Sequence, residues 1–126
     1  MHVLRRMIDA VRPGGIALDL QVIRPNPRAE SDRVVICEID GTPLFAKADA
    51  AVAAVDAHIA AGRLVEEAVD DHDVLKHYAN GVDLLDDWER SDRRPLWDGS
   101  DRLREIRRSC VTRERCRLRQ LRVCGD

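Results

Sequence analysis

Carboxylates and imidazoles, the side chains that most often bind metal ions, cluster in one stretch of this sequence. The stretch holds Asp70, Asp71, His72, Asp73 and His77. The two histidines are five residues apart, which separates them on a helix and places them on opposite faces of a strand. The pattern therefore indicates a solvated acidic segment, and we expect no metal site here.

Four cysteines, at positions 37, 110, 116 and 124, are the candidate nucleophiles. None of them is separated from another by two residues, so the C-x-x-C spacing of redox and zinc sites does not occur. The first ten residues contain no signal-peptide core, and no apolar run approaches the roughly 20 residues that span a bilayer. We therefore expect reduced thiols in a cytoplasmic protein.

Arginines occupy every second position near the C-terminus, at Arg113, Arg115, Arg117 and Arg119. On a strand this spacing places all four side chains on one face, and we call them the arginine ladder. Residues 66–98 hold about 11 acids against about 4 bases, whereas residues 100–126 hold about 9 arginines against about 4 acids. We expect the ladder to pair with this acidic block and to shield a sheet edge.

A nucleic-acid interface is the alternative interpretation of the ladder. Aromatic residues make up only 3% of the chain and the net charge is -2, so both stacking side chains and an attractive field are lacking. We expect neither nucleic acid nor a membrane as partner.

Alternating helical and extended patterns position these residues. Leu4, Met7, Ile8 and Val11 predict a helix over residues 2–11, which Pro13 and two glycines end. A strand follows over residues 16–23, with Leu18, Leu20 and Val22 expected in the core. A second strand over residues 33–40 is expected to form an antiparallel hairpin with it.

The remaining elements are predicted from the same periodicities. They are a helix over residues 47–61 that carries Val52, Val55 and Ile59 and is capped by Gly62, a strand over 64–78, a turn at Asn80-Gly81, short helices over 82–90 and 100–109 with Ser100 as the N-cap, and a last strand over 110–123. A length of 126 residues suits one domain, and the alternation indicates an α/β layered fold.

The segment "LRRMIDAVRPGGIALDLQV" resembles class I S-adenosylmethionine-dependent methyltransferases, in which a helix leads through an Arg-Pro-Gly-Gly turn into the fifth strand of a Rossmann-like sheet. The elements that follow resemble the same family's ending: a helix, a sixth strand, a short helical excursion and a seventh, antiparallel strand. The resemblance implies a partial Rossmann-like sheet made of the last strands, mixed parallel and antiparallel, with helices packed on it. It also implies S-adenosylmethionine as cofactor and methyl transfer by ancestry.

The cofactor loop of that family is not found in this sequence. No G-x-G pattern occurs, and Gly14-Gly15 enters a strand, whereas a cofactor loop leaves a strand and opens a helix. In that family the loop and the ribose-binding acid precede the region that is matched here. We therefore expect no S-adenosylmethionine binding by this chain alone, which would be a fragment, half of a split gene or a relic. The strand at 16–23 then has an exposed edge that recruits a second copy or a partner chain.

The substrate-facing candidates lie beyond the ends of the predicted strands, where ligands gather in open α/β sheets. They are Arg24 and Asn26 after the first strand, and His72, His77 and Tyr78 toward the end of the strand over 64–78. No catalytic base is assigned, because transfer of an activated methyl group needs only proximity and orientation. Two other interpretations stay open: an interaction module that completes a partner's sheet, and an unrelated small α/β domain.

Overall fold

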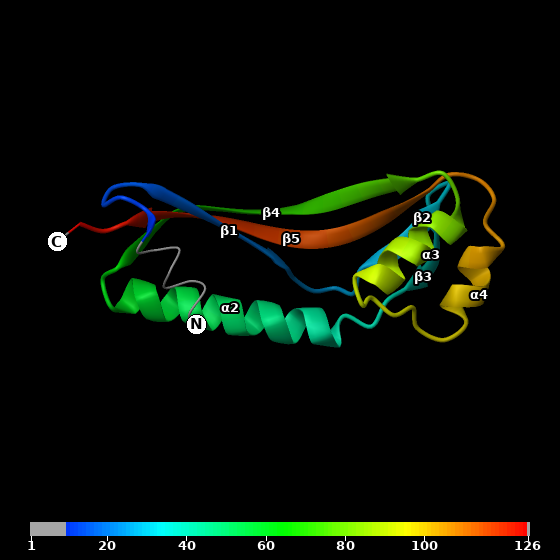
Figure 1. The fold of residues 1–126 in the computed structure, drawn as a ribbon, viewed down its shortest axis with the longest axis horizontal. Helices are drawn as coiled ribbons and strands as arrows, with labels where there is room; N and C mark the ends of the chain where they lie inside the picture. The colour runs from blue at the N-terminus through cyan, green and yellow to red at the C-terminus, as the bar shows by residue number, and fades with distance from the viewer. Residues whose placement is uncertain (1–9, 126) are drawn as a thin grey trace. The chain divides into compact units, whose positions relative to one another are not determined.

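The computed structural model describes residues 10–125 of the chain, which form two compact units. Unit 1 comprises the described residues up to Val22, Leu44–His72 and the described residues from Cys116, and unit 2 comprises Ile23–Pro43 and Asp73–Arg115. The elements labelled in Figure 1 are β1 (Ile16–Val22), β2 (Arg28–Ser31), β3 (Val34–Glu38), α2 (Thr42–Ala60), β4 (Leu64–Tyr78), α3 (Gly81–Arg90), α4 (Gly99–Arg104) and β5 (Cys110–Val123). Both β4 and β5 contribute residues to each unit.

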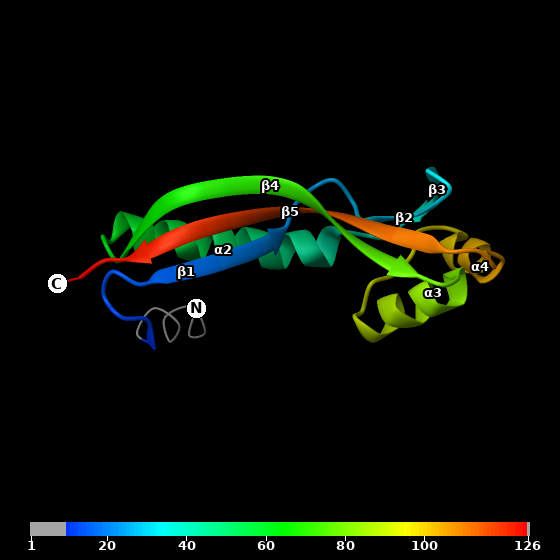
Figure 2. The ribbon, with the colours of Figure 1, turned by 90° about the horizontal axis from the view of Figure 1, so that it is seen from above.

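The five strands form an antiparallel sheet, so the predicted α/β class is confirmed and the predicted parallel pairing is wrong. β5 pairs with β1, β2 and β4, and β2 pairs with β3. In unit 1, β5 lies between β1 and β4 (Figure 2). Since β5 is antiparallel to both neighbours, β1 and β4 run in the same direction without touching each other.

The core of unit 1 forms where α2 covers one face of the strands (Figure 1). Its buried side chains are Val55, Leu64, Leu121 and Val123, with Ala17 and Ile59 packed against them. The predicted helix is confirmed, although it begins at Thr42, because Asp40 accepts the N–H of Thr42 and Pro43 suits the first turn. Gly62 caps its end as predicted, with a positive φ of 76°.

β1 presents the opposite face to the core from the one predicted. Leu18 is 59% exposed and Leu20 is 54% exposed, whereas Ala17 on the other face contacts the core. Both faces of this strand alternate regularly, so the periodicity alone does not say which face meets the helix. The prediction chose the larger side chains, but Ala17 stands opposite Leu121, the β5 residue that α2 covers.

The Arg-Pro-Gly-Gly turn is anchored to the end of β5. Gly14 has a φ of 81° and its N–H donates to the carbonyl of Val123 at 2.7 Å, while Val123 donates back to Gly15 at 2.9 Å. A Cβ on Gly15 would lie 2.6 Å from Val11 and 2.8 Å from the carbonyl oxygen of Arg12. Each glycine is therefore required, Gly14 for its conformation and Gly15 for space.

Unit 2 contains a hairpin that differs from the prediction. β3 pairs with β2, which lies inside the predicted loop, and β1 pairs with β5. The reason is the two-residue turn at Asp32 and Arg33, where positive φ values of 50° and 65° give the twist of a tight hairpin. The prediction of a hairpin between residues 16–23 and residues 33–40 is therefore wrong.

Two short helices complete the core of unit 2. The side chain of Asn80 accepts the N–H of Asp83 at 2.9 Å and caps α3, at the position where the sequence predicted a turn. α4 is shorter than predicted and follows Asp98, not Ser100. The large buried side chains are Ile36, Ile39, Leu84, Leu85, Trp88 and Leu103.

The predicted helix over residues 2–11 lies almost wholly outside the described residues. Within residues 10–125, no helix is both long enough and apolar enough to cross a membrane.

Candidate functional site

The arginine ladder pairs with acids of β4, as predicted. In unit 1, Arg117 donates two hydrogen bonds to Asp71, at 2.8 and 2.9 Å. Arg119 donates from Nε to Glu66 at 2.7 Å and from Nη2 to Asp56 on α2 at 3.0 Å. The side chain of Arg119 is only 8% exposed and that of Arg117 is 42% exposed, so the two pairs differ mainly in burial.

The unit 2 half of the ladder shares one carboxylate. Arg113 and Arg115 donate to the two oxygens of Asp73, at 2.8 and 3.2 Å, and Arg113 also reaches Glu30 at 3.0 Å. The predicted role of the ladder in shielding an edge is wrong, because β5 has partners on both sides. The ladder instead ties the central strand to its neighbours.

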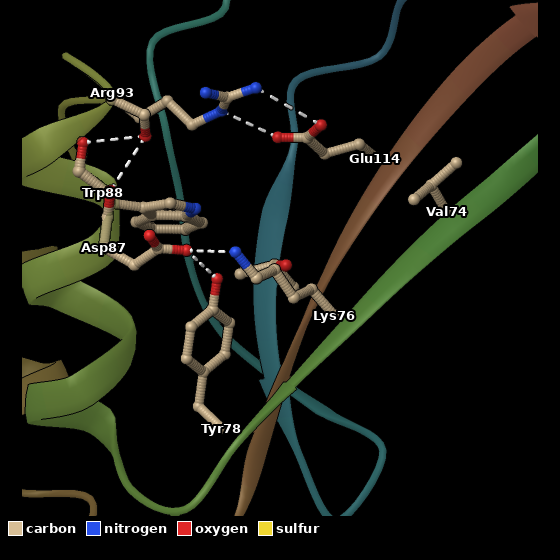
Figure 3. A pocket seen from close by; sticks show the side chains of 9 residues that line it. Val74, Lys76, Tyr78, Asp87, Trp88, Arg93 and Glu114 are labelled. Atoms are coloured by element: carbon tan, nitrogen blue, oxygen red, sulfur yellow. Dashed lines mark hydrogen bonds and ion pairs between the residues drawn. The ribbon is translucent and has the colours of Figure 1, made fainter.

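A cavity of about 200 Å³ in unit 2 collects polar side chains from β4, α3 and β5 (Figure 3). Asp87 on α3 accepts hydrogen bonds from Lys76, at 2.7 Å, and from the hydroxyl of Tyr78. Across the cavity, Arg93 donates to both carboxylate oxygens of Glu114, at 2.8 and 3.4 Å. The other lining residues are Val74, Trp88, Ser91 and Thr112.

The electrostatics of this cavity do not favour proton transfer. Hydrogen bonds from Lys76 and Tyr78 lower the pKa of Asp87 to about 2, and the bond to Asp87 raises the pKa of Lys76 above its ordinary value. Burial, followed by the bond to Asp87, raises the pKa of Tyr78. A general acid or base works best with a pKa near the operating pH, and these three groups are displaced away from it. The arrangement therefore fixes α3 to β4.

The sequence-predicted candidates are not brought together into one site. Tyr78 lines the cavity of Figure 3, whereas Asn26 lines a different and smaller cavity of unit 2. Arg24 and His77 have exposed side chains and line neither of these two cavities. His72 belongs to unit 1.

Local contacts account for two of these candidates. His72 lies with its Nδ1 atom 2.9 Å from a carboxylate oxygen of Asp70. Asn26 accepts the backbone N–H of Gly41 at 3.0 Å, which fixes its amide group. The first of these contacts lies within β4 and the second fixes a loop, and neither assigns a catalytic role.

Sequence reasoning missed Asp87, Trp88 and Arg93 as cavity residues. Trp88 is buried at the helical spacing of Leu84 and Leu85, which is a core pattern, and Asp87 stands beside it. The sequence points to Asp87 only through its position next to Trp88, which is buried. The partners of Asp87, Lys76 and Tyr78, lie on another element, β4. Pairings between elements are not visible in a single sequence.

The described residues hold no loop of the kind that binds S-adenosylmethionine in the family that the sequence resembles. The family's cofactor loop leaves a strand and opens a helix, so that backbone N–H groups face the ligand. Gly14 and Gly15 enter β1, and their backbone N–H groups donate to Val123 and Arg12. Within residues 10–125 no other pair of adjacent glycines occurs, so we derive no cofactor chemistry for this chain alone.

One exposed apolar feature of unit 1 is the outer face of β1. Ile16 is 49% exposed and lies on the same face as Leu18 and Leu20. β1 pairs only with β5 among the described strands, so its second edge carries backbone groups without a strand partner. We call this strand edge and its three apolar side chains the β1 edge.

The sequence matches no protein-family model, and comparisons with curated proteins and with solved structures give no match. Its function must therefore be inferred from the residues and contacts described above.

Proposed function

We propose that this chain supplies the closing strands of a class I methyltransferase-like sheet, and that the β1 edge joins another sheet that carries the S-adenosylmethionine site. The chain alone then transfers no methyl group. In this role it contributes structure, and the surface of a partner completes the enzyme.

The order and direction of the unit 1 elements support this proposal. Among the unit 1 elements, β1 is followed by α2 and β4, with the unit 2 strands β2 and β3 between β1 and α2 in the chain. β4 runs in the same direction as β1, and the final strand β5 is antiparallel to both. The resemblance implied a fifth strand, a helix, a sixth strand and a seventh, antiparallel strand in this order. The insertion of β5 between β1 and β4 explains how all pairings are antiparallel although β1 and β4 have a common direction.

The turn into β1 gives a second line of support. The resemblance places an Arg-Pro-Gly-Gly turn directly before the fifth strand, and here Gly14 and Gly15 both have a structural requirement at that point. The motif therefore has a structural role in the turn that leads into β1.

The exposed β1 edge is the observation that carries the proposal. Burying a leucine or isoleucine side chain contributes about 1.5–3 kcal/mol, and three such side chains are about half exposed here on a strand with a free edge. Open apolar edges pair with other chains unless charges or prolines protect them, and β1 carries a single charged residue, Asp19. A strand from another sheet would pair with the edge, and an element packed on that sheet would cover the apolar face.

The same edge favours a second candidate function, a module that completes the sheet of a partner that is not a methyltransferase. Both candidates require a strand on the β1 edge. They differ in whether the complex binds S-adenosylmethionine.

The test combines calorimetry with light scattering on the purified chain. In the absence of a partner sheet, we expect two copies to associate through the β1 edge, and we expect no heat of binding on titration with S-adenosylmethionine. Leu18→Lys places a charge on this edge and should abolish the association. Val82→Lys is the matched control, because Val82 is 44% exposed on α3 and lies outside the edge.

Three results would contradict the proposal. Micromolar binding of S-adenosylmethionine by the chain alone would show a cofactor site among its own residues. A wild-type chain that stays monomeric at all concentrations, or a Leu18→Lys variant that associates as the wild type does, would remove the edge as the joining surface.

A further inference from the structure

A small cavity in unit 2 brings three guanidinium groups together. It has a volume of about 60 Å³ and is lined by Pro25, Asn26, Arg28, Asp73, Arg113 and Arg115. The space exceeds the roughly 30 Å³ that one water molecule occupies in the liquid. It is large enough for a small oxyanion group.

Strand register forces two of these arginines together. Arg28 on β2 stands directly opposite Arg113 on β5, and Arg115 follows two residues later on the same face. Like charges directly opposite each other destabilise a sheet unless an anion lies between them. Glu30 supplies one such anion, 2.5 Å from the Nε atom of Arg28 and 3.0 Å from that of Arg113, and Asp73 supplies the other.

The two carboxylates do not neutralise the cluster. Burial raises the pKa of Glu30, but hydrogen bonds from Arg28 and Arg113 outweigh it and hold the pKa below its ordinary value. Hydrogen bonds from Arg113 and Arg115 lower the pKa of Asp73. With both acids ionised, the three guanidinium groups bond to two carboxylates, so this hydrogen-bonded cluster has one positive charge in excess. Glu38 stands opposite Arg28 on β3, outside the hydrogen-bonded cluster.

Hydrogen-bond donors also remain in excess. Three guanidinium groups carry about 15 N–H donors. Within residues 10–125, four side-chain bonds from these arginines reach Glu30 and Asp73. The amide oxygen of Asn26 accepts the N–H of Gly41, so the NH₂ group of Asn26 adds two further donors at the cavity wall.

We propose that Arg28, Arg113, Arg115 and Asn26 bind one oxyanion, the carboxylate or phosphate group of a small molecule. Guanidinium groups hold such ions through paired, charge-assisted hydrogen bonds. Glu30 fixes the guanidinium planes of Arg28 and Arg113, so that their remaining N–H groups are oriented before the ligand arrives. The site lies wholly within unit 2 and does not depend on the proposed function.

The experiment is a calorimetric titration of the full chain with inorganic phosphate and, separately, with acetate. Arg115→Gln is the main variant, because Arg115 makes one side-chain bond in the described structure and its side chain is 41% exposed, so the fold should tolerate the change. Arg117→Gln is the matched control, since it removes the same charge from the next ladder position, where the partner is Asp71. Circular dichroism verifies that both variants are folded.

We expect Arg115→Gln to weaken binding of the preferred anion about tenfold, since a hydrogen bond to a charged group is worth roughly that factor. Arg117→Gln should leave the affinity unchanged. Asp73→Asn should tighten binding several-fold, because it removes a competing anion and releases two donors. Whichever of phosphate and acetate binds more tightly identifies the oxyanion geometry that the site prefers.

Three outcomes would overturn the proposal. They are no saturable binding of either anion by the wild-type chain, equal weakening by Arg115→Gln and Arg117→Gln, and weaker binding by Asp73→Asn. Equal weakening would show a diffuse effect of net charge. None of these results bears on the β1 edge.

Discussion

Replacing Arg119 by methionine should destabilise the protein far more than the same change at Arg117. Both residues belong to the arginine ladder, and both donate two or more hydrogen bonds to carboxylates. Methionine retains most of the apolar stem, so the comparison isolates the guanidinium group. What separates the two positions is exposure, 8% against 42% of the side chain.

The magnitude follows from the partners that Arg119 leaves behind. Breaking a buried ion pair by removing one partner costs roughly 3–5 kcal/mol, because the other charge stays buried without compensation. The side chains of Glu66 and Asp56 are 37% and 60% exposed, so water can rehydrate them in part. We therefore expect Arg119→Met to lower the free energy of unfolding by about 2–3 kcal/mol. Arg117 pairs in solvent, where ion pairs contribute little to stability. Arg117→Met should therefore lower the free energy of unfolding by a clearly smaller amount.

Urea unfolding followed by circular dichroism at neutral pH measures both variants. Glu66→Gln provides a further comparison, because it removes the charge and keeps the size of the acceptor. Equal destabilisation at positions 117 and 119, or a loss below about 1 kcal/mol for Arg119→Met, would refute the reasoning that burial decides the strength of the ladder pairs.

Three further predictions concern unit 2 and the thiols. Arg33→Gly should raise the melting temperature, because the left-handed backbone conformation of Arg33 costs roughly 1 kcal/mol that glycine avoids. Arg94→Gly should not raise it, and equal effects of the two changes would exclude strain in the β2–β3 turn. Asp87→Asn should lower the urea midpoint at neutral pH, because a carboxyl whose pKa is lowered in the folded state stabilises the fold only while it is ionised. The difference in midpoint between variant and wild type should shrink as the pH falls from about 4 to about 2, and a difference that does not depend on pH would refute this. At neutral pH, Cys124 should react with a thiol reagent first and Cys37 only on unfolding, since burial raises the pKa of Cys37 to about 11; equal rates would contradict it.

The elements with a long, regular pattern could be predicted from the sequence. β4 and β5 have the predicted bounds, and α2 differs mainly in its start. The pairing of the ladder with the acidic block was also predictable, because opposite charges at strand spacing have few other partners. The hairpin was not, since the strand at Arg28–Ser31 is only four residues long and stands among prolines.

The face of β1 and the composition of the cavities could not be predicted for a different reason. Leu18 and Ala17 alternate with equal regularity, and the choice between them depends on where α2 packs. The oxyanion cavity combines Asn26 with arginines from β2 and β5, and only the strand register places Arg28 opposite Arg113. Single-sequence periodicity contains no information on register between distant strands.

Hydrogen exchange along β1, measured by mass spectrometry at low and high protein concentration, tests the central claim most directly. If the β1 edge joins another strand, the amides of Ile16–Val22 that do not bond to β5 should gain protection as the concentration rises, and Leu18→Lys should remove this gain. Amides of α3 should not change. Equal exchange of β1 at all concentrations, in the wild type and in the variant, would contradict the proposal that this strand is a joining edge.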